Sequence, residues 1–176
     1  MYMIPFALGN LLGPLLLGRF FDTVGRRKMI FGTYAFAAVV LAASAVLFQR
    51  GALTPTTHTI FWCVAFFFAS AGASSAYLTV SEIFPLEVRG QAISYFFSIA
   101  QIAGAIAPLI FGNLIGDGSS RGPLVAGYLI GSGIMLIGGL VALFLGVDAE
   151  GKGLEAITDP LSRDRAKQSD NAGVPA

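Results

Sequence analysis

Five long apolar stretches limit what this chain can fold into. They cover residues 2–21, 29–48, 60–80, 92–115 and 123–147. A helix of about 20 residues crosses the hydrocarbon core of a bilayer, and each stretch reaches that length. Lipid cannot bond to the exposed edges of an open sheet, and the alternation typical of barrel strands is absent. We therefore predict an all-α integral membrane fold, with five transmembrane helices in residues 1–147 and a polar tail in residues 148–176.

The composition supports a membrane-embedded chain. Hydrophobic residues make up 55% of the sequence and charged residues 12%, whereas soluble domains carry about 25% charged residues. The predicted surroundings are thus a lipid bilayer. A net charge of +1 gives no indication of a nucleic-acid partner. The first stretch lacks the basic start and cleavage site of a signal peptide, so we interpret it as a span.

The distribution of basic residues predicts the orientation in the membrane. The connections after the first and third stretches, and the tail, carry Arg26, Arg27, Lys28, Arg89, Lys152, Arg163, Arg165 and Lys167. The other two connections carry only Arg50 and Arg121. Because basic loops stay on the cytoplasmic side, the N-terminus is predicted outside and the tail in the cytoplasm. The predicted location is the plasma (inner) membrane.

Small residues recur at four-residue spacing within the stretches. The pairs are Gly9/Gly13, Ala100/Gly104, Gly112/Gly116 and Gly127/Gly131. Helices in lipid pack closely where side chains are small. We expect these pairs at helix contacts.

Residues 18–28 form a connection in which each feature has a physical role. The segment reads GRFFDTVGRRK. Gly18 would let a neighbouring helix approach, and Asp22 could accept hydrogen bonds from a facing arginine or a helix N-terminus. Gly25 permits a turn, while Arg26 and Arg27, with the lysine after them, would anchor the next span in the cytosol.

Residues 81–90 form a second connection with charges on both sides of a proline. The segment reads SEIFPLEVRG. Pro85 would end the incoming helix. Glu82 and Arg89 could pair with one another, or with Arg26 and Asp22 at the membrane surface. The alternative is an exposed surface pair that contributes little.

These two connections resemble known transporter motifs. Residues 18–28 match the G-x-x-x-D-x-x-G-R-R-K signature of the major facilitator superfamily. Residues 82–90 are similar to the E-x-x-P-x-x-x-R-G element after the tenth span of the sugar porters, and EGKGLEAI at residues 150–157 is similar to their G-K-x-L-E-x-I segment after the last span. The resemblance implies helices eight to twelve of a twelve-helix carrier, whose loop pairs latch the cytoplasmic side in the outward-facing state.

The resemblance also implies that a complete carrier contains more than these spans. The expected partners are the missing N-terminal helices of that carrier, and the chain is expected to be a fragment, a truncated gene product or one part of a split carrier. Paired halves around a central cavity are the usual architecture of such proteins.

Three polar residues within the stretches are candidates for solute binding: Asn10, Tyr77 and Gln101. Asn10 stands where sugar porters commonly carry an asparagine that faces the sugar, whereas Tyr77 and Gln101 stand where that family favours tryptophan or another aromatic residue. Amide and phenol groups can donate and accept hydrogen bonds. Alternatively, Asn10 and Gln101 bond neighbouring helices and Tyr77 only packs. Weaker candidates are Tyr34, Ser94, Tyr95 and Ser98.

Catalysis and metal binding find no support in the sequence. His58 and Cys63 lack the partner residues that a metal site or an activated nucleophile requires, so we predict no enzyme activity, cofactor or metal. His58 is expected to be an interfacial residue. Proton coupling, as in a symporter, normally needs a buried ionisable group. In proton-coupled sugar porters that acid belongs to the first helix, so the coupling ion and direction stay open.

These observations lead to a predicted function of transmembrane transport. The solute would be small and hydrophilic, and the sugar-porter resemblance implies a sugar or polyol, carried by alternating access as part of a secondary carrier. One alternative is a carrier for an organic acid or another metabolite. The other is a truncated, non-transporting membrane protein that associates with a full-length carrier.

Overall fold

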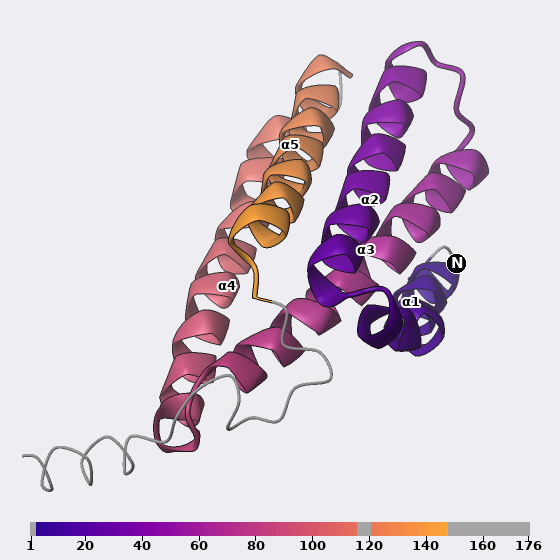
Figure 1. Cartoon of the computed structure of the whole chain (residues 1–176). Coiled ribbons are helices and arrows are strands. Elements are labelled where there is room, and N and C mark those ends of the chain that lie inside the picture. Colours follow the sequence, from indigo (N-terminus) through magenta and orange to yellow (C-terminus); the bar gives the residue numbers. More distant parts are fainter. Residues whose placement is uncertain (1–2, 116–120, 148–176) are drawn as a thin grey trace, which may run out of the picture.

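The computed structural model describes residues 3–115 and 121–147 and contains five long helices (Figure 1). They are α1 (Met3–Thr23), α2 (Arg26–Gln49), α3 (Pro55–Ile83), α4 (Leu86–Ile115) and α5 (Gly122–Leu145). Each helix is long and apolar enough to cross a membrane, and the described residues contain no strand. The predicted all-α membrane fold is confirmed. The tail and the EGKGLEAI segment lie outside the described residues.

Helices α2, α3 and α4 begin before the apolar stretches predicted from the sequence, and local signals set the ends of α3. At the start of α3 the backbone N–H of Thr54 donates to Thr57 Oγ1 at 2.9 Å, and Thr57 N–H donates back to Thr54 Oγ1 at 3.3 Å. This reciprocal cap, followed by Pro55 in the first turn, fixes the helix start. Between α3 and α4, Phe84 is extended and Pro85 lacks the N–H that would continue the helix. Apolarity therefore marks the part that crosses lipid, while caps mark the helix ends.

Four of the helices form a compact group, and α4 stands apart from it. In Figure 1, α2 lies between α3 and α5, while α1 lies against α3. One buried cluster joins Phe21, Ile30 and Ala71 of the first three helices. A second joins Ala45 to Val125 and Tyr128. In contrast, α4 has no buried residue.

Two of the four small-residue pairs lie where helices meet. A Cβ atom at Gly9 would lie 3.1 Å from the carbonyl oxygen of Cys63, and one at Gly13 would overlap the carbonyl oxygen of Phe67. A Cβ at Gly127 would lie 2.9 Å from side-chain atoms of α4. A Cβ at Gly112, however, meets nothing within 4 Å. Among these pairs, the closest helix approach is thus between α1 and α3.

The expectation for Gly18 requires correction. A Cβ atom at Gly18 would meet nothing within 4 Å, so this glycine does not permit a close helix contact. Instead, Gly18 lines a hollow of about 120 Å³ between α1 and α3, together with Asp22, Ser74 and Ser75. Helices α1 and α3 touch at Gly13 and lie farther apart at Gly18, so the hollow forms beside Gly18.

Candidate functional site

A buried arginine joins three helices at the basic end of the bundle. Arg26, in the first turn of α2, is 5% exposed. Its Nη2 donates to Glu82 Oε1 at 3.1 Å and to Asp22 Oδ1 at 3.3 Å, and its Nη1 pairs with Glu82 Oε2. Both terminal nitrogens of the Arg26 guanidinium thus bind the Glu82 carboxylate. This bidentate geometry makes the ion pair strong and fixes its orientation. These contacts tie the ends of α1, α2 and α3 together.

Gly25 makes the turn that brings Arg26 into this position. Its φ of 106° lies in the region that side chains other than glycine rarely adopt. It immediately precedes α2, so the helix can begin directly after α1 ends. The predicted role of Gly25 in the turn agrees with this geometry.

The neighbouring basic residues bond to backbone carbonyl groups. Arg27 Nε donates to the carbonyl oxygen of Leu143, in the last turn of α5, at 3.1 Å. Arg89 Nη2 donates to the carbonyl oxygen of Phe84 at 3.5 Å, within its own connection. Within the described part of the chain, Arg89 forms no ion pair. Of the alternatives open in the sequence, the structure contains the pairing of Glu82 with Arg26, not with Arg89.

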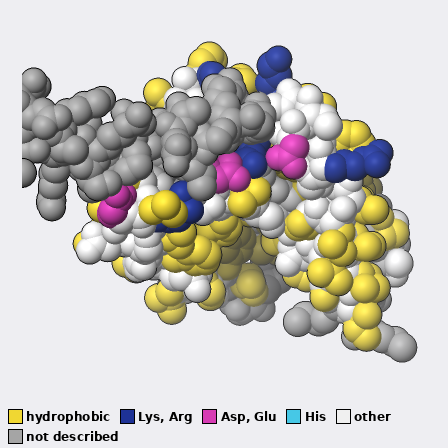
Figure 2. Space-filling model, turned by 60° about the horizontal axis from the view of Figure 1, so that its bottom comes forward, with side chains coloured by type: hydrophobic (Ala, Val, Ile, Leu, Met, Phe, Trp, Pro, Cys, Tyr) yellow, Lys and Arg dark blue, Asp and Glu magenta, His cyan; other side chains and the backbone are white. Residues whose placement is uncertain are grey.

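Charged side chains gather at this end of the bundle, and apolar ones cover the flanks (Figure 2). Exposed apolar residues run along the outer faces of several helices, among them Leu8, Leu15 and Ile99. Lipid is the solvent that such a surface requires.

A hollow of about 340 Å³ brings two of the three predicted solute-binding residues together. Asn10 comes from α1 and Tyr77 from α3, and Tyr34 of α2 lies beside them. The remaining lining residues are Phe66, Ala69, Ser70, Ala73, Ser74 and Met135. The lining thus combines amide, phenol and hydroxyl groups with apolar side chains, as sites for small molecules do.

Several polar groups of this hollow are available to a solute. The Ser70 hydroxyl donates to the backbone oxygen of Asn10 at 2.7 Å, which fixes α1 against α3. Among the described residues, by contrast, neither the side-chain amide of Asn10 nor the hydroxyl of Tyr34 or Tyr77 has a hydrogen-bond partner. Asn10 therefore bonds the neighbouring helix α3 through its backbone oxygen and not through its side-chain amide.

Gln101 lies away from the hollow. It is exposed on α4, as are its neighbours through Ile110. Its Oε1 lies 4.0 Å from the Cβ position of Gly104, on the same helix. The structure therefore does not place Gln101 with Asn10 and Tyr77.

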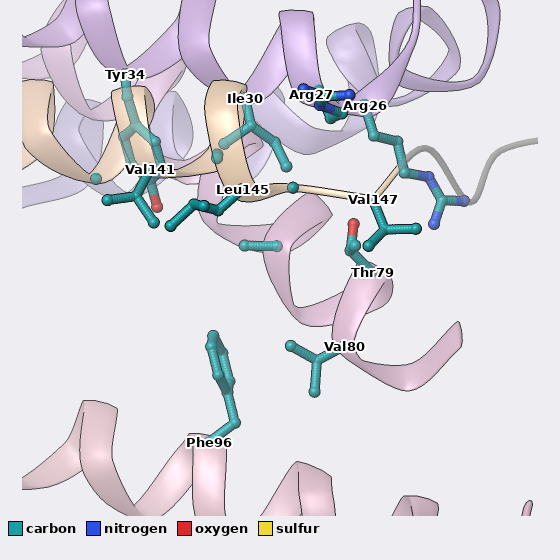
Figure 3. A pocket seen from close by; sticks show the side chains of 14 residues that line it. Arg26, Arg27, Ile30, Tyr34, Thr79, Val80, Phe96, Val141, Leu145 and Val147 are labelled. Atoms are coloured by element: carbon teal, nitrogen blue, oxygen red, sulfur yellow. The ribbon is translucent and has the colours of Figure 1, made fainter. Parts of the chain in front are cut away.

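Tyr34 also lines a second hollow. The second hollow has a volume of about 460 Å³ and lies between α2, α3, α4 and α5. Figure 3 shows Tyr34 and Arg26 toward opposite ends of it, with Ile30 between them and Phe96 facing it from α4. Tyr34 thus contributes to the walls of both hollows.

The sequence indicates Tyr34 only as a weaker candidate and gives no prediction for Ser70, Ser74 and Met135, which also line the hollow. A signal for two of these was present, because Ser70, Ser74 and Tyr77 follow the four- and three-residue spacing of one helix face. Polar side chains on one face of a membrane helix point away from lipid. Met135 carries no comparable signal, since an apolar side chain is as common on a lipid-facing side of a membrane helix as on a packed one.

At the opposite end of the bundle, aromatic rings surround His58. Its ring stacks on Phe48 at 5.1 Å and meets Trp62 and Tyr128 edge-on at 5.2 and 5.7 Å. This packing is consistent with the interfacial role expected for His58. The described residues contain no group of three His, Cys, Asp or Glu side chains that could hold a metal ion.

Comparison with known proteins identifies the family. The sequence profile of the Major Facilitator Superfamily matches residues 1–168. The chain is 30% identical over 150 residues to the "Cis,cis-muconate transport protein" of Acinetobacter baylyi (strain ATCC 33305 / BD413 / ADP1), covering 82% of this chain and 33% of that protein. It is 25% identical over 134 residues to the "Synaptic vesicle 2-related protein" of Xenopus laevis, covering 76% of this chain and 23% of that protein.

No solved structure matches the chain. The chain spans about a third or less of the length of the two curated relatives. The family profile, however, extends over all five helices. The chain belongs to the major facilitator superfamily, a family of membrane transporters.

Proposed function

We propose that this chain supplies helices eight to twelve of a secondary carrier that moves a small organic acid across a membrane by alternating access. The observation that carries the proposal is the hollow where Asn10, Tyr34 and Tyr77 present unpaired polar groups. Superfamily membership supports transport as the use of that hollow. The remaining helices, on the same polypeptide or another, would close the other side of the site.

The organic-acid class rests on the similarity to the muconate transport protein. The free phenol and amide groups of the hollow can donate hydrogen bonds to a carboxylate. Phe66 and Met135 offer apolar surface to the carbon chain. None of the nine lining residues is positively charged. A cation that neutralises the carboxylate would therefore come from the remaining helices.

A sugar or polyol is the second candidate solute. The neutral lining of the hollow favours it, because hydroxyl groups need donors and acceptors but no counter-charge. Asn10 also stands at the position where the sugar porters carry an asparagine. The similarity to a muconate transport protein favours the organic acid, and we rank the candidates in that order.

An uptake assay separates the two candidates. The chain is reconstituted in proteoliposomes together with a polypeptide that supplies the remaining helices, and we call this preparation the reconstituted carrier. Radiolabelled cis,cis-muconate, a hexose and a polyol are offered in turn. We expect uptake of the dicarboxylate alone. Uptake of the hexose or polyol without the dicarboxylate would establish the second candidate, and no uptake of any solute by a folded carrier would refute transport.

We further propose that the cluster of Asp22, Arg26 and Glu82 holds the cytoplasmic side closed. Its contacts link three helix ends, so a change that separates those ends must break them. Cysteine labelling from the cytoplasmic side tests this proposal. Glu82→Ala should raise the labelling of cysteines placed in the hollow, because it removes the bidentate partner of Arg26, and unchanged labelling would contradict the latch.

The proposed orientation places the cluster in the cytoplasm of the cell, at the plasma (inner) membrane. Arg26, Arg27, Lys28 and Arg89 all lie at this end, as the positive-inside rule requires. In a chain with Cys63 replaced, a cysteine at Ala52 should react with an impermeant reagent outside the cell. A cysteine at Val24 should not, and the reverse pattern would invert the topology.

A further inference from the structure

Aromatic side chains support one wall of the solute hollow. The ring of Tyr77 lies nearly parallel to that of Phe97, with centroids 4.4 Å apart and an interplanar angle of 18°. The ring of Phe96 meets Tyr77 edge-on at 5.2 Å. Both arrangements are favourable geometries for aromatic pairs. Tyr77 also lines the hollow, so two rings of α4 support a side chain that borders it.

A second aromatic ring of the hollow is held in place by two glycines. A Cβ atom at Gly72 of α3 would lie 3.5 Å from Tyr34 Cε2, and one at Gly139 of α5 would lie 3.3 Å from Tyr34 Cβ. The missing side chains let Tyr34 lie directly against both helices. Its ring position is therefore set by backbone packing and does not need to be ordered when a solute binds.

We infer that the site prefers acids with a planar, conjugated carbon skeleton over saturated acids of the same length, and that Tyr77 determines this preference. The inference rests on the proposed function and names its substrate class more closely. A flat π system can stack on an aromatic ring, whereas a saturated chain cannot. A saturated chain also loses more rotational freedom when it is bound.

The lining of the hollow fits the same class. Polar groups of Asn10 and Ser74 lie on the lining beside the rings. A short acid could therefore place its carboxylate on the polar groups and its flat skeleton against Tyr77.

The test compares cis,cis-muconate with adipate, which has the same carbon chain and the same two carboxylates but no double bonds. Uptake of both is measured on one preparation of the reconstituted carrier, so differences in expression or folding cancel in the ratio. We expect wild-type carrier to prefer muconate by roughly two- to tenfold, the size of an aromatic pairing contribution. Tyr77→Phe, which keeps the ring, should retain the ratio, and Tyr77→Leu should bring it close to one.

Tyr95→Leu is the matched control. Tyr95 lies on α4, is 70% exposed and does not line the hollow, so its replacement should leave the ratio unchanged. Equal uptake of muconate and adipate by wild type, or an unchanged ratio in Tyr77→Leu, would overturn the inference while transport of organic acids stands. Uptake of neither acid would instead overturn the proposed function on which the inference rests.

Discussion

Arg26 is buried although it stands in a basic connection between two spans. Its side chain is 6% exposed, whereas the side chains of Asp22 and Glu82 are 63% and 24% exposed. A buried charge needs a close partner, because water no longer solvates it. Glu82 meets that need far better than Asp22, which remains largely in solvent. In this cluster the contact of Arg26 with Glu82 is thus strong, and its contact with Asp22 is weak.

Replacement of the two carboxylates should therefore have unequal effects on stability. We predict that Glu82→Ala lowers the free energy of unfolding by about 3 kcal/mol, since it leaves Arg26 buried without its bidentate partner. Asp22→Ala should lower it by about 1 kcal/mol or less, as for an exposed pair. Unfolding of the two variants in detergent micelles, followed by circular dichroism, measures the difference. Equal losses would contradict the burial argument.

The sequence allowed the residue types of this cluster to be predicted but not all their partners. Asp22, Gly25 and Glu82 could be singled out because their spacing is unusual for a chance basic loop. Whether Glu82 would bond Arg26 or Arg89 depended on how the helix ends lie relative to each other, which no local pattern encodes. Arg89 instead reaches the carbonyl oxygen of Phe84.

At the scale of helices, the close contact between α1 and α3 is made by two glycines on one face of α1. Gly9 and Gly13 meet the backbone of Cys63 and Phe67, which have the same four-residue spacing on α3. Helices gain little from hydrophobic burial in lipid, so such close approach supplies much of their attraction. Gly18, on the same helix, has no such contact.

Replacing Gly13 and Gly18 by alanine should change the stability of the chain in opposite directions. Gly13→Ala should destabilise the chain by about 1 to 3 kcal/mol, because the new methyl group overlaps backbone that cannot move independently of its helix. Gly18→Ala should be neutral or stabilise it by up to about 1 kcal/mol through helix propensity. Thermal unfolding of both variants in the same micelles provides the comparison. A stabilising Gly13→Ala would show that α1 and α3 do not touch there.

Helices α2 and α5 are joined by hydrogen bonds at both ends and in the middle. Arg27 bonds the carbonyl oxygen of Leu143 near the end of α5, and Arg121 bonds that of Phe48 near the end of α2. Between them, the Ser132 hydroxyl donates to the carbonyl oxygen of Ala38 at 2.7 Å. Cations near helix C-termini also oppose the negative end of the helix dipole. These bonds hold α2 and α5 together along their whole length.

The central hydrogen bond of this pair can be tested separately. Ser132→Ala should cost about 0.6 kcal/mol, the usual contribution of a hydrogen bond between membrane helices. Ser94→Ala is the control, since Ser94 bonds the Gly90 carbonyl oxygen of its own helix. Unfolding midpoints measured for several independent preparations resolve this difference. A loss in Ser94→Ala equal to that in Ser132→Ala would argue against a specific α2–α5 contact.

At the scale of the whole molecule, the sequence predicted the membrane class and the order of the helices but not how they pack. Length and apolarity decide the class because a bilayer has a fixed thickness. The same apolarity hides the packing faces, since these helices have apolar residues on nearly every side and lack the contrast of an amphipathic helix. The positions of Tyr34 and Gln101 illustrate the consequence. Tyr34 lines the hollow, whereas Gln101 lies away from it.

The most direct test of the central claim asks whether the hollow at Asn10 is where the solute binds. Uptake of radiolabelled cis,cis-muconate by the reconstituted carrier is compared for Asn10→Ala and Asn113→Ala. Asn113 is the matched control, since its amide donates to the Leu109 carbonyl oxygen of its own exposed helix at 3.0 Å. Loss of a hydrogen bond to a charged group predicts at least about a tenfold decrease in apparent affinity for Asn10→Ala, with Asn113→Ala unchanged. Equal apparent affinities in the two variants would contradict the assignment of the hollow as the solute site.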